Sequence, residues 1–383
     1  MNKRIIIGNI FDIGGEFKEG IEEKISVLGQ IIQEPLRDLY SNYFIKLRLY
    51  PFKIKLDTFK IDVESGSYQA ELYVKIFPYG AVILFLSIES ESEDFNTNFD
   101  LFWIKNFKIN NEEINLTNYF KNKFSSIFNT LEEYIEIEYS VSEFIDEYRI
   151  LIDNSELDDE NIFSLLINDK KVGKCSRIIQ DILNPNLGCF DSEKVIITSK
   201  NAYVKFNEKE IDNIQALIEL GYTQMYELKV YDYLLDEYIE TLYKESETYK
   251  FNSSLLGPTI FSKKYKKLIE RAMSLLELRV DIVDLIRDIS NALKVTDDVY
   301  YSHVYSKIIE KLKFSSLYET VKLKIEEIEK FNSLMRDEDN VVRAAKLEFW
   351  IILLFVVDII IVIGEMYPGI YSSMINIFKN LFN

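Results

Sequence analysis

The chain has 383 residues and is acidic, with 63 Asp and Glu residues against 45 Lys and Arg and a formal net charge of −18. This charge argues against general nucleic-acid binding, which needs a basic surface, so we expect no nucleic-acid partner. The length and a hydrophobic content of 48% are sufficient for two or three domains with a buried core.

Residues 1–206 are predicted to form an α+β domain with a mixed or antiparallel sheet. Apolar and polar residues alternate from residue 45 to residue 56 and from 68 to 76, which is typical of half-buried strands. After the turn Pro78-Tyr79-Gly80, residues 81–88 are nearly all apolar, which predicts a strand buried on both faces. Further strands are predicted at 5–10, 102–109, 134–139, 148–152 and in a hairpin of 195–198 with 202–206, and helices at 17–32, 119–131 and 176–183.

Residues 207–340 are predicted to form a helical hairpin or stalk, because the apolar period becomes 3.6 and stays there. The expected helices cover 208–249, 262–293, 297–312 and 315–335. The last helix carries a coiled-coil-like stripe, which suits either packing within the chain or the seam of an oligomer. Its residues are Leu317, Val321, Ile325, Ile328, Phe331 and Met335. Residues 336–340 are predicted to be a polar hinge.

Residues 341–383 are predicted to form a membrane anchor with a short amphipathic tail. Between Phe349 and Ile363 only Asp358 is polar, which favours a single transmembrane helix over a very hydrophobic helix in a protein core. Basic residues lie mainly before this stretch, so the positive-inside rule keeps the amino-terminal part in the cytoplasm. The sequence therefore predicts a single-pass, tail-anchored protein of a bacterial cell membrane.

Asp358 is the unusual residue of this stretch, because a carboxylate deep in a bilayer is costly. Either it pairs with a polar group of another helix, which implies a homo-oligomer, or it lies near the headgroups on a shallow anchor. Glu348 and Trp350 begin the stretch and are the other candidate membrane or oligomer residues.

The sequence predicts no catalytic, cofactor-binding or metal-binding residues, and hence no enzyme. His303 is the only histidine, which argues against a catalytic triad or a histidine metal site. No glycine-rich phosphate loop is found. A magnesium site made only of carboxylates stays open as an alternative.

Several stretches resemble one family. Residues 77–85, beginning Phe77-Pro78-Tyr79-Gly80, are similar to its FPYGAVVFW strand, and residues 221–232, with Gln224 and Glu227, are similar to its ALAQSVKLxxYE helix. Residues 276–281, which include Arg279, add a helical segment, and residues 347–352 are similar to its terminal LEWIII segment. The family is the DUF155 group, also called the "required for meiotic nuclear division" family.

This resemblance implies a carboxy-terminal membrane anchor, frequent oligomerisation and no established catalytic residues. The family's eukaryotic members include a mitochondrial inner-membrane protein that supports organellar translation. The leading hypothesis is a tail-anchored membrane scaffold or organiser with protein partners still unknown. The alternatives are a component of an ion channel or transporter with a CorA-like layout, and a carboxylate- and magnesium-dependent enzyme.

Overall fold

The protein is described here from a computed structural model, in which the chain divides into two compact units. The first unit is Met1–Lys322 and the second is Leu323–Asn383. The structure describes residues 3–18, 20–32, 50–137, 144–155, 157–169, 176–184, 186–188, 193–206, 209–251 and 296–366.

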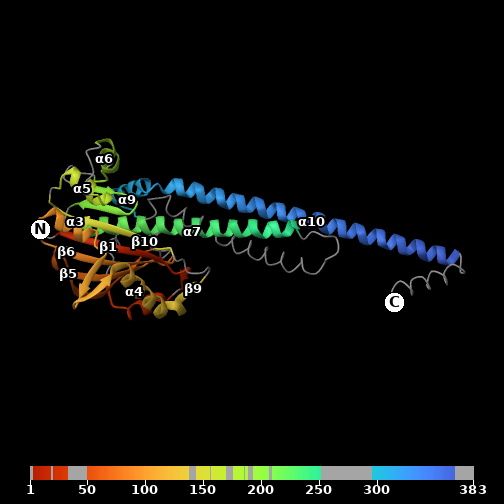
Figure 1. The fold of residues 1–383 in the computed structure, drawn as a ribbon, viewed down its shortest axis with the longest axis horizontal. Helices are drawn as coiled ribbons and strands as arrows, with labels where there is room; N and C mark the ends of the chain where they lie inside the picture. The colour runs from red at the N-terminus through yellow and green to blue at the C-terminus, as the bar shows by residue number, and fades with distance from the viewer. Residues whose placement is uncertain are drawn as a thin grey trace. The chain divides into compact units, whose positions relative to one another are not determined.

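The first unit contains a ten-stranded sheet, which occupies the region labelled β1, β5, β6 and β10 in Figure 1. Its strands are β1 (Lys3–Asp12), β3 (Gln30–Ile32), β4 (Phe52–Val63), β5 (Gly66–Ile76), β6 (Ala81–Ser90), β7 (Asn106–Ile109), β8 (Glu112–Asn115), β10 (Asp146–Ile152), β11 (Lys194–Ile197) and β12 (Asn201–Lys205). Their order is β11-β12-β10-β1-β6-β5-β4-β7-β8, with β3 paired to β4. All neighbours are antiparallel except β10 and β12, so the sheet is mixed. A separate two-stranded sheet pairs β2 (Gly15–Phe17) with β9 (Ile135–Ile137).

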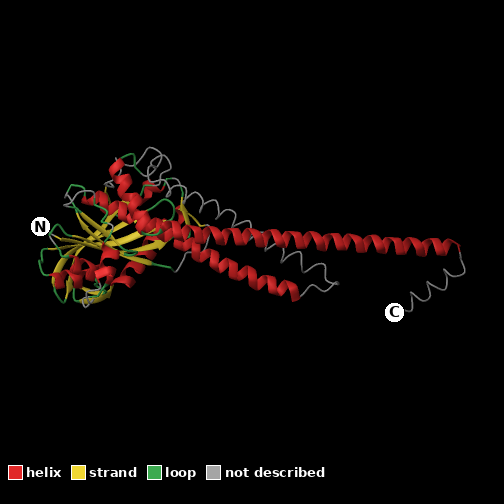
Figure 2. Cartoon of the chain, turned by 90° about the horizontal axis from the view of Figure 1, so that it is seen from above, coloured by secondary structure: helices red, strands yellow, loops and turns green. Residues whose placement is uncertain are grey.

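Helices surround this sheet, as Figure 2 shows. The described helices of the whole chain are α1 (Ile21–Ile25), α3 (Phe95–Phe102), α4 (Leu116–Leu131), the 3₁₀ turn η1 (Glu132–Tyr134), α5 (Asp159–Ile167), α6 (Ser176–Leu183), α7 (Ile211–Phe251), α9 (Val299–Lys311) and α10 (Phe314–Met366), and most of α10 belongs to the second unit. Four of them begin after an Asx residue whose side chain accepts a backbone N–H of the first turn, namely Asp94, Asn115, Asp158 and Asp298. Such caps satisfy amide groups that a helix leaves unpaired at its start.

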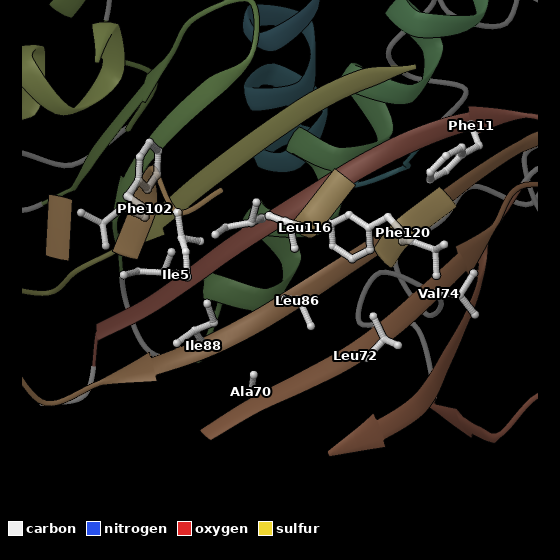
Figure 3. Packing of buried hydrophobic residues seen from close by; sticks show 14 of the residues in the cluster. Ile5, Phe11, Ala70, Leu72, Val74, Leu86, Ile88, Phe102, Leu116 and Phe120 are labelled. Carbon is white, nitrogen blue, oxygen red and sulfur yellow. The ribbon is translucent and has the colours of Figure 1, made fainter. Parts of the chain in front are cut away.

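One face of the sheet packs against α3, α4 and α5. Alternate residues of the central strands point to this face, because side chains alternate along a strand. Ile5 of β1 and Leu86 of β6 meet Phe102 of α3 and Phe120 of α4 in one buried cluster (Figure 3). This face of the sheet is thus covered by helices from the first half of the chain.

The opposite face packs against α7 and α9. Ile6, Phe85 and Ile150 belong to a second buried cluster that also contains Leu217 of α7 and Ile308 of α9. Since α7 lies between the sheet and α9, its first turns are buried on nearly every side. This burial makes any polar residue on the sheet-facing side of α7 informative.

The α+β class and the mixed sheet are confirmed, including the strand predicted at 81–88 and the hairpin that β11 forms with β12. The strand predicted at 102–109 is partly wrong, because α3 extends to Phe102 and β7 starts only at Asn106. The helix predicted at 17–32 is only five residues long and is followed by β3. The hinge predicted at 336–340 is helical, because α10 continues through it, and the helix predicted at 262–293 lies outside the described residues.

The predicted transmembrane helix needs correction: among the residues that the structure describes, no helix is both long and apolar enough to cross a membrane. The predictions of a single-pass, tail-anchored membrane protein with a cytoplasmic amino-terminal domain are corrected with it.

Candidate functional site

A row of polar residues runs along the side of α7 that faces the sheet. Gln215, Glu219, Thr223 and Glu227 are spaced four residues apart, so they lie on one side of the helix. Each has an exposed fraction of 4% or less. Buried polar groups are costly unless they are paired, so this polar row is the first candidate for a functional site.

Glu219, in the middle of the polar row, is surrounded by partners. Lys75 of β5 places its Nζ 2.6 Å from Oε2, and both side chains are almost fully buried. Tyr148 of β10 donates its hydroxyl to Oε1 at 3.1 Å, and Gln215 donates Nε2 to the same oxygen at 2.8 Å. Burial, the Glu219 charge and this hydrogen bond raise the pKa of Tyr148 well above its ordinary value, so Tyr148 stays a donor. These contacts fix α7 to two strands of the sheet.

Asp146, at the start of β10, forms a second ionic contact with α7. Its carboxylate lies 2.5 Å from Lys229 Nζ of α7 and 2.8 Å from Lys200 Nζ. Burial alone favours the neutral acid, but the charges of Lys229 and Lys200 outweigh it and lower the pKa of Asp146. Asp146 is therefore ionised at neutral pH.

Glu227, at the last position of the polar row, has a different environment. Its carboxyl group is 1% exposed, and neither oxygen has a hydrogen-bond partner among the described residues. Burial raises the pKa of the Glu227 carboxyl well above 4.5, and the charges of Asp12 and Glu16 raise it further. The group is thus a buried acid that favours its protonated form.

The turn Phe77-Pro78-Tyr79-Gly80 connects β5 to β6 and contacts the turn that follows β1. Gly80 accepts from Ile13 N at 3.1 Å, and Pro78 accepts from Phe17 N at 3.1 Å. Gly80 has φ +103°, and a Cβ on it would meet Gly15 O at 2.1 Å. Glycine is required here because the two backbones approach too closely for a side chain.

The other predicted residues are distributed over different parts of the fold. Gln224 is buried on α7 but accepts the Tyr305 hydroxyl of α9, away from the polar row. His303 is an exposed residue of α9. Arg279 lies outside the described residues. The structure therefore brings the Phe77–Gly80 turn and Glu227 to the same end of the sheet, whereas Gln224, less than one turn away on α7, faces α9.

Glu348, Trp350 and Asp358 all lie on α10 and are exposed. They belong to the described stretch 347–362, which we call the apolar segment. Its large apolar side chains are between 37% and 65% exposed. Because consecutive positions are exposed, the apolar segment presents apolar side chains on all sides of the helix.

The sequence reasoning missed Lys75, Glu219 and Asp146. A weak signal for Glu219 exists, because the four-residue spacing of polar residues interrupts the otherwise apolar first turns of α7. No local signal marks Lys75, which alternates with apolar residues of β5 as a solvent-facing lysine would. Only the docking of α7 on the sheet converts that outward position into a buried one.

The described residues contain no group of three or more His, Cys, Asp or Glu side chains that could hold a metal ion. The polar row thus supplies charge pairing and a proton-binding carboxyl group rather than a ligand cluster. Comparison with protein-family models, with curated proteins and with solved structures finds no match.

Proposed function

We propose that the protein is a non-catalytic scaffold whose copies associate through the apolar segment of α10. The observation that supports this proposal is the exposure of Phe349, Trp350, Ile351 and their neighbours on every side of the helix. Exposed apolar patches of this kind mark interaction surfaces, because water contact with them is unfavourable.

A bundle of copies is the partner that suits this surface. A single neighbouring helix covers one side only, whereas several copies of the segment can cover most of it. The first unit carries its own buried clusters on both faces of the sheet. The first unit can therefore remain folded while the apolar segments of several copies associate.

Asp358 gives the association its register. A polar residue at an otherwise apolar helix contact fixes which positions meet and how many helices assemble, at a cost in stability. We place the contact between copies on the side of α10 that carries Asp358. The substitution Asp358→Leu should then strengthen association but produce a mixture of sizes.

The interior of the first unit supports a scaffold over an enzyme. Glu219 and Asp146 are each paired with cations of the same chain, so their charges fix α7 on the sheet. The alternative of a magnesium-dependent enzyme predicts that Mg²⁺ raises the unfolding temperature of the full chain. The relation to the DUF155 group stays a prediction that rests on the quoted motifs.

The mass of the full chain in solution tests the proposal. Sedimentation velocity should show an oligomer for the wild type and a smaller species for Leu354→Gln with Ile361→Gln, two exposed positions of the apolar segment. Leu323→Gln, an equally exposed position of α10 outside the segment, is the matched control and should leave the mass unchanged. A wild type that is monomeric in water, or that floats with lipid vesicles instead of self-associating, would show the proposal to be wrong.

A further inference from the structure

Glu227 is the one member of the polar row for which the described residues offer no partner. Both carboxyl oxygens are inaccessible and accept no hydrogen bond there. An ionised carboxylate in such a place is strongly unfavourable, and a buried acid normally takes up a proton instead. The Glu227 carboxyl group is therefore stable when it is protonated, or when a positive charge comes close to it.

The charges around Glu227 come mainly from one short segment. Asp12, the last residue of β1, and Glu16 in β2 are the two acids whose fields act on it. Asp146 also acts on the neighbouring Tyr226, but its charge is balanced by Lys200 and Lys229. We call residues 12–17 the β1–β2 turn.

Backbone hydrogen bonds attach the β1–β2 turn to the neighbouring turn of the sheet. Gly14 N donates to Asp12 Oδ1 at 2.9 Å, and the amides of Ile13 and Phe17 donate to the Phe77–Gly80 turn. β2 adds a three-residue pairing with β9. Residues 13–17 follow the last pair of the β1–β6 ladder, Asp12 with Ala81, so their separation from α7 leaves that ladder in place.

We propose that Glu227 is a pH-operated switch: with its proton, it lets the β1–β2 turn close over α7, and without its proton it repels Asp12 and Glu16 and releases that turn. No covalent chemistry is involved, because one proton moves from the Glu227 carboxyl to solvent and returns on closing. The switch acts in the first unit and does not depend on self-association of α10.

The sign of the effect follows from the direction of the pKa shift. Since the folded state holds the Glu227 proton more tightly than an unfolded chain does, the closed form is favoured below pH 4.5 and loses stability as the pH rises above that value. The loss continues until the pH passes the pKa of the folded state.

Amide hydrogen exchange of Ile13 and Phe17 in the full chain measures the opening directly. After correction for the intrinsic effect of pH, wild-type exchange at both amides should rise by up to about tenfold per pH unit between pH 4.5 and the pKa of Glu227 in the folded state, and then level off. Glu227→Gln should abolish that dependence, because the amide cannot ionise. Glu16→Gln is the matched control, since it removes a charge from the turn but leaves the proton site, and it should keep a pH dependence.

A second measurement needs no variant. Infrared spectra of the full chain with carbonyl-labelled glutamate should show the band of a protonated carboxylic acid at a pH above the range in which exposed glutamates titrate. The band should be lost at the pH where the exchange of Ile13 and Phe17 stops rising. Absence of that band above the range of the exposed glutamates would overturn the proposal. So would an identical corrected pH dependence in wild type and Glu227→Gln, or stabilisation by Na⁺ or Mg²⁺ that Glu227→Gln abolishes, which would assign the site to a cation.

Discussion

Glu219 and Glu227 lie about two turns apart on the same side of α7 and are both buried, yet their carboxyl groups have opposite environments. Glu219 meets Lys75, Tyr148 and Gln215, all within the first unit. Glu227 is acted on by the charges of Asp12 and Glu16, and neither of its carboxyl oxygens accepts a hydrogen bond among the described residues. The difference shows that burial alone does not determine whether a carboxyl group is ionised. The charges and hydrogen-bond donors on the neighbouring strands also determine it.

The largest expected effect comes from removing the cation at the Glu219 end. Lys75→Met should lower the free energy of unfolding by about 3–5 kcal/mol, because it leaves a buried carboxylate without its counter-ion. Urea unfolding at pH 7 measures this loss. The double variant Lys75→Met with Glu219→Leu should recover most of it, because the pair is then replaced by apolar groups. An equal loss in both variants would contradict the ion-pair interpretation.

A smaller loss of stability is expected at the end of the polar row that holds Glu227, where backbone groups of the Phe77–Gly80 turn contact the β1–β2 turn. Gly80→Ala should lower the free energy of unfolding by about 1–3 kcal/mol, because it places a side chain at positive φ and against Gly15 O. Exchange of the Ile13 amide should increase more than exchange of amides near Lys75. Uniform acceleration at both ends would mean that the two ends of the polar row open together.

Asp146 is a second buried, ion-paired acid, but unlike Lys75 at Glu219 its lysine partners reach the solvent. Asp146→Asn should cost about 1 kcal/mol at neutral pH, since its partners Lys200 and Lys229 are themselves partly in solvent. The pKa of Asp146 is lowered in the folded state, so its contribution is present above pH 3.8 and is lost as the pH falls below that value. Unfolding curves of wild type and variant should therefore converge in acid, the opposite pH direction to Glu227.

The smallest effect is expected for the neutral donor at Glu219. Tyr148→Phe removes a single hydrogen bond while Lys75 and Gln215 remain, so a loss of about 0.5–1.5 kcal/mol is expected by thermal unfolding. Tyr305→Phe is the comparison variant, because it removes one hydrogen bond on the other side of α7, where the Tyr305 hydroxyl of α9 donates to Gln224. A much larger loss for Tyr148→Phe would mean that Lys75 alone cannot hold the Glu219 charge.

The sheet could be predicted from sequence where its strands carry a local pattern. The continuous apolar run of β6 and the alternation of β5 both identify strands. The short helices α3 and α5 were not predicted, because each begins in an acidic stretch. In both cases the aspartates Asp94 and Asp158 are helix caps.

The candidate site was predicted only in part. Glu227 and the Phe77–Gly80 turn were identified by resemblance, whereas Lys75 and Asp146 were not. Their roles depend on contacts between positions far apart in sequence, such as Lys75 with Glu219 and Asp146 with Lys229. No periodicity within one element carries that information.

The central place of β1 has a consequence for how the chain is made. Ile6 pairs with Ser87 of β6 on one side and with Ile150 of β10 on the other. At ordinary rates of translation, the second partner leaves the ribosome on the order of ten seconds after the first strand. During that interval the isoleucine-rich β1 has an open edge, which is prone to wrong pairing with other chains. The protein should therefore fold slowly for its size and depend on chaperones during synthesis, with β10 as the strand that closes the edge.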